Sequence, residues 1–164
     1  MGKGIALNIL AMLVTGARAP EFTLPDQDGH DISLTALLKS GPAILFFYPA
    51  DFTPTCTREA CSIRDIHKEI SRAGITVAGI SPQSPESHKR FREKHNLPYT
   101  LLADETKEVI KMFGVNGPLG FWVQRVTFLV DQNRTIRGRV KATFSVAEHE
   151  AFIKQAIEIR QTPI

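Results

Sequence analysis

Short, wholly apolar runs alternate with longer segments of mixed character along this chain, and this alternation predicts a layered α/β structure. A short uninterrupted apolar run is typical of a strand buried on both faces of a sheet. The intervening segments carry helical periodicity or helix start and stop signals. The predicted strands are residues 43–48, 76–81, 99–103, 126–131 and 135–141. The predicted helices are residues 34–39, 53–73, 84–95, 105–113 and 145–161.

Two turns add to this picture. Residues 21–35 alternate around Asp28-Gly29, which predicts an N-terminal β-hairpin. Residues 132–134 join the last two strands as a second antiparallel hairpin. The order βαβαβ followed by ββα predicts a mixed sheet with helices on both faces, although the order alone leaves several α/β folds open.

The chain has 164 residues, of which 43% are hydrophobic, and this predicts a single domain over residues 1–164. We expect residues 1–15 to form an extension packed on that domain. The apolar stretch 5–14 is too short to span a bilayer. Ala17-Arg18-Ala19 resembles a signal-peptide cleavage site, but Pro20 would follow the cut directly. The expected compartment is therefore the cytoplasm, with no membrane partner.

The net charge is +3, and the basic residues are scattered. The densest run, His88–His95, is interpreted as the solvated face of a helix, with a phosphate-binding stripe as the alternative. We therefore expect no nucleic-acid partner. The histidines show no metal-ligand spacing, so neither a metal nor another cofactor is expected.

Cys56 carries the candidate chemistry. If Thr53 is the N-cap of its helix and Pro54 the first helical residue, Cys56 lies in the first turn. Free amide N–H groups and the positive end of the helix dipole surround that turn, and both stabilise a thiolate over a thiol. The alternative is that Cys56 is simply a small buried hydrophobic residue.

Cys61 follows five positions later, about 140° around the same helix and away from its apolar stripe. The Cα atoms of residues i and i+5 in a helix are roughly 8–9 Å apart, whereas a disulfide needs less than about 7 Å. A bond between the two sulfurs therefore requires the first turns of the helix to unwind.

The residues Pro49, Thr53 and Cys56 form a Pro-x-x-x-Thr-x-x-Cys pattern, which resembles the active-site signature of peroxiredoxins. The run Cys-Thr-x-Glu-Ala-Cys from Cys56 to Cys61 is similar to the Q-type peroxiredoxins, also called bacterioferritin comigratory proteins. The resemblance covers most of the chain, including residues 19–26, 79–81, 97–99 with Asp104, and 124–128. Thr55 departs from it, because a glycine is common before the cysteine. The resemblance implies a thioredoxin-like fold.

The resemblance also implies an activity. Cys56 matches the peroxidatic cysteine, which reduces hydrogen peroxide or an organic (alkyl) hydroperoxide and becomes a sulfenic acid. Cys61 matches the resolving cysteine, which forms an intramolecular disulfide that thioredoxin or a similar dithiol donor reduces. The resemblance favours a monomer, with a dimer as the alternative.

Four further residues match positions of the family. Thr53 matches the residue whose hydroxyl contacts the peroxide, Arg125 the arginine that holds thiolate and peroxide, and Pro49 the proline that shields the pocket. Glu59 matches a frequent family position without a defined role. The simpler interpretations are an N-cap for Thr53, a strand terminator for Pro49 and a surface charge for Arg125.

Three other functions remain open at this point. A thiol–disulfide oxidoreductase of the same fold usually carries a Cys-x-x-Cys pair, whereas four residues separate the two cysteines here. A one-cysteine peroxidase would leave Cys61 as a bystander. A metal-binding or scaffold protein lacks support, because two cysteines without a suitably spaced histidine pair make a poor zinc site.

Overall fold

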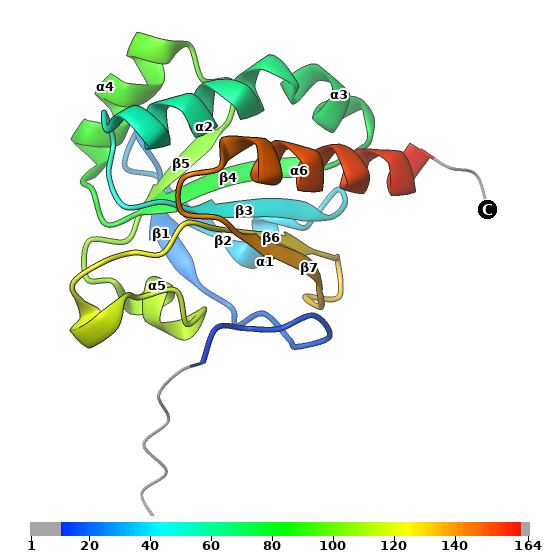
Figure 1. The fold of residues 1–164 in the computed structure, drawn as a ribbon, viewed down its shortest axis with the longest axis horizontal. Coiled ribbons are helices and arrows are strands. Elements are labelled where there is room, and N and C mark those ends of the chain that lie inside the picture. Colours follow the sequence, from blue (N-terminus) through cyan, green and yellow to red (C-terminus); the bar gives the residue numbers. More distant parts are fainter. Residues whose placement is uncertain (1–10, 162–164) are drawn as a thin grey trace, which may run out of the picture.

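A five-stranded mixed sheet forms the centre of the molecule in the computed structural model, which describes residues 11–161 (Figure 1). The strand order is β5-β4-β3-β6-β7. Strands β3, β4 and β5 are parallel, and β6 and β7 are antiparallel to their neighbours. The strands are β3 (Ala43–Phe47), β4 (Thr76–Ser81), β5 (Thr100–Ala103), β6 (Val126–Val130) and β7 (Ile136–Lys141). The predicted mixed sheet is confirmed.

The predicted N-terminal hairpin is also confirmed, as β1 (Thr23–Pro25) paired with β2 (Asp31–Ser33). The Asp26 carboxylate accepts hydrogen bonds from the amides of Asp28 and His30, at 2.9 Å each. Gly29 has a φ of 81°, a conformation that a glycine adopts without strain. The turn chemistry read from the sequence therefore fixes this hairpin.

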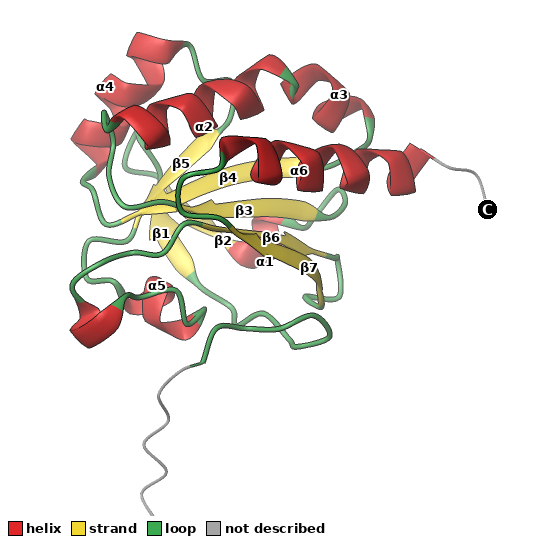
Figure 2. Cartoon of the chain, in the orientation of Figure 1, coloured by secondary structure: helices red, strands yellow, loops and turns green. Residues whose placement is uncertain are grey.

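Helices cover both faces of the sheet, as predicted (Figure 2). Helices α2, α3, α4 and α6 lie on one face, and α1 and α5 lie with the hairpin on the other. Their bounds are α1 (Leu34–Leu37), α2 (Pro54–Asp65), α3 (His67–Arg72), α4 (Pro85–His95), α5 (Glu108–Met112) and α6 (Val146–Gln161). Between residues 11 and 161, no helix is long and apolar enough to cross a membrane.

Strand β3 divides the apolar core in two. Leu45 and Phe47 point into the cluster under α1 and α5, whereas Ile44 and Phe46 point into the cluster under α2, α4 and α6. Because side chains alternate along a strand, a strand buried on both faces has to be apolar at every position. The first residues after β3, which carry the site, therefore leave a rigid central strand.

Two element predictions were wrong in detail, and one short element was missed. The helix predicted over 53–73 is two helices, because Ile66 adopts a φ of −106° and a ψ of 9° between α2 and α3. No glycine or proline in the sequence signals this break. The helix predicted over 105–113 is confined to α5, which begins after a left-handed Lys107. A short 3-10 helix, Pro118–Gly120, was not predicted.

The basic run of α4 also needs a correction. Most of its residues are exposed or half-buried, but His88 and Phe91 are fully buried, so His88 is not part of a solvated face. Residues 1–10 of the expected N-terminal extension lie outside the described residues. From residue 11 onward the chain does pack on the fold, since Met12 and Leu13 contact the core cluster.

Candidate active site

The loop after β3 leads directly to the candidate nucleophile. Tyr48 to Phe52 connect β3 to α2, Thr53 is the N-cap, and Pro54 stands in the first turn, as predicted. Cys56 therefore lies in the first turn of α2, with only 2% of its surface exposed. The free amide groups of this turn and the helix dipole favour an anionic sulfur.

Arg125 holds the sulfur of Cys56 from the opposite side. Val126 of β6 pairs with Phe47 of β3, so the residue before β6 lies level with the end of β3. The Arg125 guanidinium donates from Nη2 to Cys56 Sγ at 3.0 Å and from Nη1 to Glu59 Oε2 at 2.6 Å. Its Nε donates to the Thr143 carbonyl at 3.0 Å. Arg125 is 4% exposed, so it is not the surface charge that the simpler interpretation allowed.

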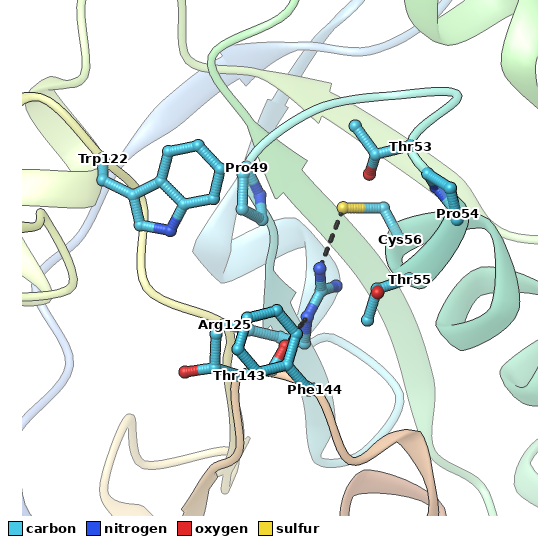
Figure 3. A pocket seen from close by; sticks show the side chains of 9 residues that line it. All are labelled: Pro49, Thr53, Pro54, Thr55, Cys56, Trp122, Arg125, Thr143 and Phe144. Atoms are coloured by element: carbon cyan, nitrogen blue, oxygen red, sulfur yellow. Dashed lines mark hydrogen bonds between the residues drawn. The ribbon is translucent and has the colours of Figure 1, made fainter.

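A pocket of about 150 Å³ opens above the sulfur (Figure 3). Cys56, Arg125, Thr53 and Pro49 all line it, so the structure brings four of the five predicted site residues together. Thr53 occupies the N-cap position, but its hydroxyl makes no capping hydrogen bond with α2 and donates to the Ala50 carbonyl at 3.3 Å instead. Its lone pairs therefore remain available to accept a hydrogen bond from a bound molecule.

The apolar wall of the pocket was missed by sequence reasoning. Trp122 and Phe144 line it opposite α2, and both side chains are largely exposed. They come from loops far from Cys56 in sequence, and only the pairing of β3, β6 and β7 brings them there. An exposed aromatic residue in a loop is the one signal that could have indicated them.

Cys61 stands apart from this pocket. It is half-buried on an intact α2, and both cysteines are free thiols. Cys56 packs in the core cluster with Ala60 and Ile63, whereas Cys61 lies outside that cluster. The predicted separation of the two sulfurs on different sides of the helix therefore matches the observed burial.

Glu59, whose role the sequence left undefined, lies with His149 behind Arg125. Glu59 is 1% exposed, and its Oε1 has no hydrogen-bond partner among the described residues. His149 Nδ1 lies 3.8 Å from Oε1. The same nitrogen shares a hydrogen bond of 2.8 Å with Thr127 Oγ1. Burial raises the pKa of Glu59 above its ordinary value of 4.5, and the charges of His149 and Arg125 offset this only in part.

The contacts with Glu59 and Cys56 also shift the pKa of Arg125. Burial alone would lower the pKa of its guanidinium, but the Glu59 carboxylate and the Cys56 sulfur raise that pKa above its ordinary value. Arg125 therefore stays charged, and hydrogen bonds to Thr143, Glu59 and Cys56 fix the orientation of its guanidinium. The arrangement can stabilise negative charge that lies on the sulfur or develops beside it.

Comparison with known proteins places this geometry in a family. The AhpC/TSA family profile matches residues 15–139. Peroxiredoxin Q, chloroplastic, from Gentiana triflora is 41% identical over 144 residues, which cover 87% of this chain and 66% of that protein. The putative peroxiredoxin bcp of Coxiella burnetii is 42% identical over 142 residues, which cover 81% of this chain and 93% of that protein. The chain thus spans just under two thirds of the length of the chloroplastic relative.

Solved structures agree with this placement. Peroxidoxin BcpB from Mycobacterium tuberculosis superposes with a TM-score of 0.86 at 36% identity, covering 92% of this chain and 99% of that one. A peroxiredoxin Q of Xanthomonas campestris has a TM-score of 0.79 at 23% identity, covering 90% and 96%, and supports the fold alone. The fold is the thioredoxin-like one of peroxiredoxins, and the chain belongs to the AhpC/TSA family as a peroxiredoxin of the Q (bcp) type.

Proposed function

We propose that this protein is a thiol-dependent peroxidase in which Cys56 reduces hydrogen peroxide and organic hydroperoxides. The observation that carries the proposal is the 3.0 Å hydrogen bond from Arg125 to Cys56 Sγ, in the first turn of a helix and at the floor of an open pocket. A guanidinium and a helix N-terminus both favour the thiolate, which is the nucleophile that peroxide oxidation requires.

In the first step the Cys56 sulfur attacks one peroxide oxygen. The S–O bond forms as the O–O bond breaks, and the leaving oxygen takes up a proton and departs as water or an alcohol. Negative charge moves from the sulfur to that oxygen, and Arg125 can stabilise it at both atoms. A guanidinium has five N–H groups, and one each is directed to Thr143, Glu59 and Cys56, so two remain for the substrate.

Thr53 and Pro49 have distinct roles in this proposal. The Thr53 hydroxyl directs its hydrogen to Ala50, so its lone pairs can accept the hydroperoxide O–H and orient the attacked oxygen. Pro49 lines the pocket beside Trp122, and both keep water from the sulfur. The positions of the side chains in the pocket and the family resemblance support these proposed roles.

In the second step Cys61 attacks the Cys56 sulfenic acid, which releases water and forms the intramolecular disulfide. Cys61 is half-buried on an intact helix, so this step needs the first turns of α2 to open. Thioredoxin or a similar dithiol donor then reduces the disulfide. We further expect a cytoplasmic monomer, with a dimer as the alternative, which sedimentation measurements can distinguish.

Replacing the nucleophile tests the proposal. We expect Cys56→Ser to reduce the consumption of hydrogen peroxide and cumene hydroperoxide to the rate measured without protein. The matched variant Cys61→Ser should still consume one equivalent of peroxide in a single turnover. Peroxide consumption that survives in Cys56→Ser would refute the assignment, and insulin reduction without peroxide consumption would favour a thiol–disulfide oxidoreductase.

A further inference from the structure

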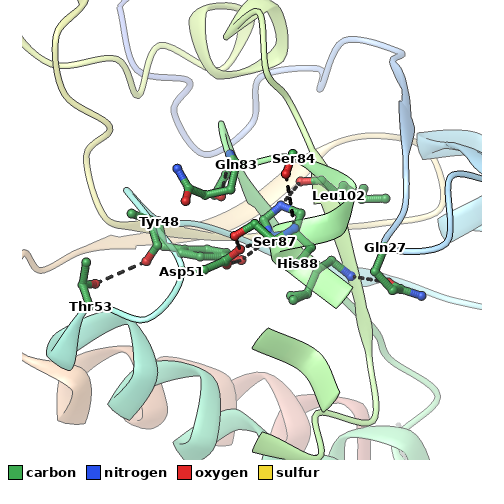
Figure 4. Close-up of polar contacts among 12 residues, drawn as sticks. Gln27, Tyr48, Asp51, Thr53, Gln83, Ser84, Ser87, His88 and Leu102 are labelled. Carbon is green, nitrogen blue, oxygen red and sulfur yellow. Dashed lines mark hydrogen bonds and ion pairs between the residues drawn. The ribbon is translucent and has the colours of Figure 1, made fainter. Parts of the chain in front are cut away.

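A buried polar cluster lies behind the loop that carries the site (Figure 4). Asp51 of this loop is 5% exposed. Its Oδ1 accepts a hydrogen bond from the Tyr48 hydroxyl at 2.7 Å, and its Oδ2 accepts one from the Ser87 hydroxyl at 2.7 Å. Oδ2 also lies 2.8 Å from His88 Nδ1. We call Tyr48, Asp51, Ser87 and His88 the Asp51 cluster. It joins the loop to α4 rather than to α2.

His88 anchors this cluster to the sheet. Its ring is fully buried, and its Nε2 lies 3.1 Å from the Leu102 carbonyl. A carbonyl can only accept, so Nε2 carries a hydrogen and donates it to β5. The other ring nitrogen faces the Asp51 carboxylate. The imidazole therefore connects a central strand of the fold with the loop, and it cannot turn without breaking both contacts.

The loop next to the cluster is strained. Phe52 has a φ of 64°, in the left-handed region that residues with a Cβ rarely adopt. Such a conformation persists only where its surroundings hold it. Phe52 stands directly between Asp51, which the cluster holds, and Thr53, which begins α2. If Asp51 were released, Phe52 could relax, and Thr53 and the first turn of α2 would move with it.

We propose that Asp51 and His88 are positioning residues that hold the loop from Tyr48 to Phe52, and Thr53 next to it, over Cys56 and thereby set the balance between the two chemical steps. The inference rests on the proposed function. Attack on the peroxide needs the closed loop, because Thr53 and Pro49 line the pocket in that state. Attack of Cys61 on the sulfenic acid, with loss of water, needs the same loop and the first turns of α2 to open.

A positioning role predicts opposite effects on the two steps. Loosening the Asp51 cluster should slow the oxidation of Cys56 and accelerate disulfide closure. Because closure competes with further oxidation by excess peroxide, less Cys56 should then reach the sulfinic acid. A residue that only stabilises the fold would not move the two rates in opposite directions.

The test uses Asp51→Asn, His88→Asn and the double variant. The only tryptophan of the chain, Trp122, lines the Cys56 pocket, so rapid-mixing fluorescence with hydrogen peroxide can follow both steps. Mass spectrometry of quenched samples distinguishes the sulfenic acid, which gains one oxygen, from the disulfide, which loses two hydrogens. We expect oxidation to slow by roughly fivefold or more and closure to accelerate in each variant, consistent with the loss of a buried charge-assisted hydrogen bond.

The double variant should resemble either single variant, because the two residues act on the loop as one unit. Asp131→Asn is the matched control. Asp131 is also a turn carboxylate that accepts hydrogen bonds, from Asn133, Thr135 and Arg137, but it lies at the β6–β7 turn. Its substitution should lower stability and leave both rates as in the wild type.

Three outcomes test the positioning role of Asp51 and His88 and separate it from the proposed function. Unchanged rates in a folded Asp51→Asn protein, or rates that both fall, would overturn the inference. If Asp51→Asn does not fold, Ser87→Ala and Tyr48→Phe each remove one hydrogen bond to Asp51 and must show the same opposite shifts, or the inference fails. A wild-type protein that does not react with hydrogen peroxide would instead refute the proposed function itself.

Discussion

Arg125 shows how much a single residue's role depends on geometry. Its three directed hydrogen bonds fix the guanidinium plane, so the contact with Cys56 is oriented as well as charged. A lysine at this position would keep the charge but lose the fork. A substitution of Arg125 should therefore act mainly by removing the oriented hydrogen bonds of the guanidinium, and less by changing the net charge.

We expect Arg125→Ala to lower the second-order rate of Cys56 oxidation by about 10- to 100-fold, the loss that corresponds to one charge-assisted hydrogen bond. Rapid mixing with hydrogen peroxide, followed by the fluorescence of Trp122 in the pocket, measures this rate. Arg125→Lys is the matched control and should recover only part of the rate. An unchanged oxidation rate in Arg125→Ala would count against a role for the contact with the sulfur.

The residues of the pocket floor could be inferred from the sequence, but their buried supports could not. Pro49, Thr53 and Cys56 lie within eight positions of one another, so a local pattern captures them. Glu59 meets His149, and Asp51 meets His88, only because α2, α4 and α6 pack on one face of the sheet. Nothing in the local sequence predicts which polar residues such packing will bury; His88 was in fact interpreted as solvated.

At the scale of elements, the break at Ile66 would limit the opening of α2 that the proposed disulfide step requires. The helix that carries both cysteines has 12 residues and ends before α3 begins. Tyr99, the residue before β5, donates a hydrogen bond to the Ala60 carbonyl at 2.6 Å and thereby holds the middle of α2 near the start of that strand. Opening of the first turns can therefore stop near Ala60, leaving α3 and the second half of α2 in place.

This limited opening gives a prediction for Cys61→Ser. After one equivalent of peroxide, the wild type should lose two hydrogens, whereas the variant should retain a sulfenic acid on Cys56. Steady-state turnover with a thioredoxin donor should fall roughly tenfold or more, because the donor then has no disulfide to attack. Mass spectrometry and a coupled peroxidase assay measure the two effects.

Ser62→Ala is the control for this variant, because it alters the adjacent position of α2, where Ser62 donates a hydrogen bond to Glu150, and keeps both sulfurs. It should turn over normally. Normal turnover in Cys61→Ser would instead make Cys61 a bystander and the protein a one-cysteine peroxidase.

At the scale of the whole molecule, the layers could be predicted because the central strands are apolar without interruption. Such runs require cover on both faces, and the intervening helices supply it. The strand order, with β6 beside β3, was not fixed by the pattern. The pairing of β6 with β3 determines the geometry of the site, because it places Arg125 level with the end of β3. Long-range pairing of this kind has no local signal.

The buried Glu59 should make the stability of the whole molecule depend on pH in a particular direction. Its folded-state pKa lies above the ordinary value of 4.5, chiefly through burial, with His149 and Arg125 acting in the opposite sense. Between these two pKa values the folded protein binds more protons at Glu59 than the unfolded chain does. Stability from this group is therefore full below pH 4.5 and is lost as the pH rises through the folded pKa.

The Glu59→Gln variant lacks this titrating group. Comparing it with the wild type therefore isolates the contribution of Glu59 to the pH dependence of stability. The difference in the free energy of unfolding, wild type minus variant, should decrease as the pH rises above 4.5, by at most about 1.4 kcal/mol per pH unit for one proton. Urea titrations at a series of pH values measure it. Asp131, Glu150 and Glu21, whose pKa values are lowered, give the opposite slope, but they are present in both proteins and cancel. A difference that stays flat or grows with pH would mean that Glu59 is ionised in the fold at no cost, so that the Arg125 ion pair fully offsets its burial.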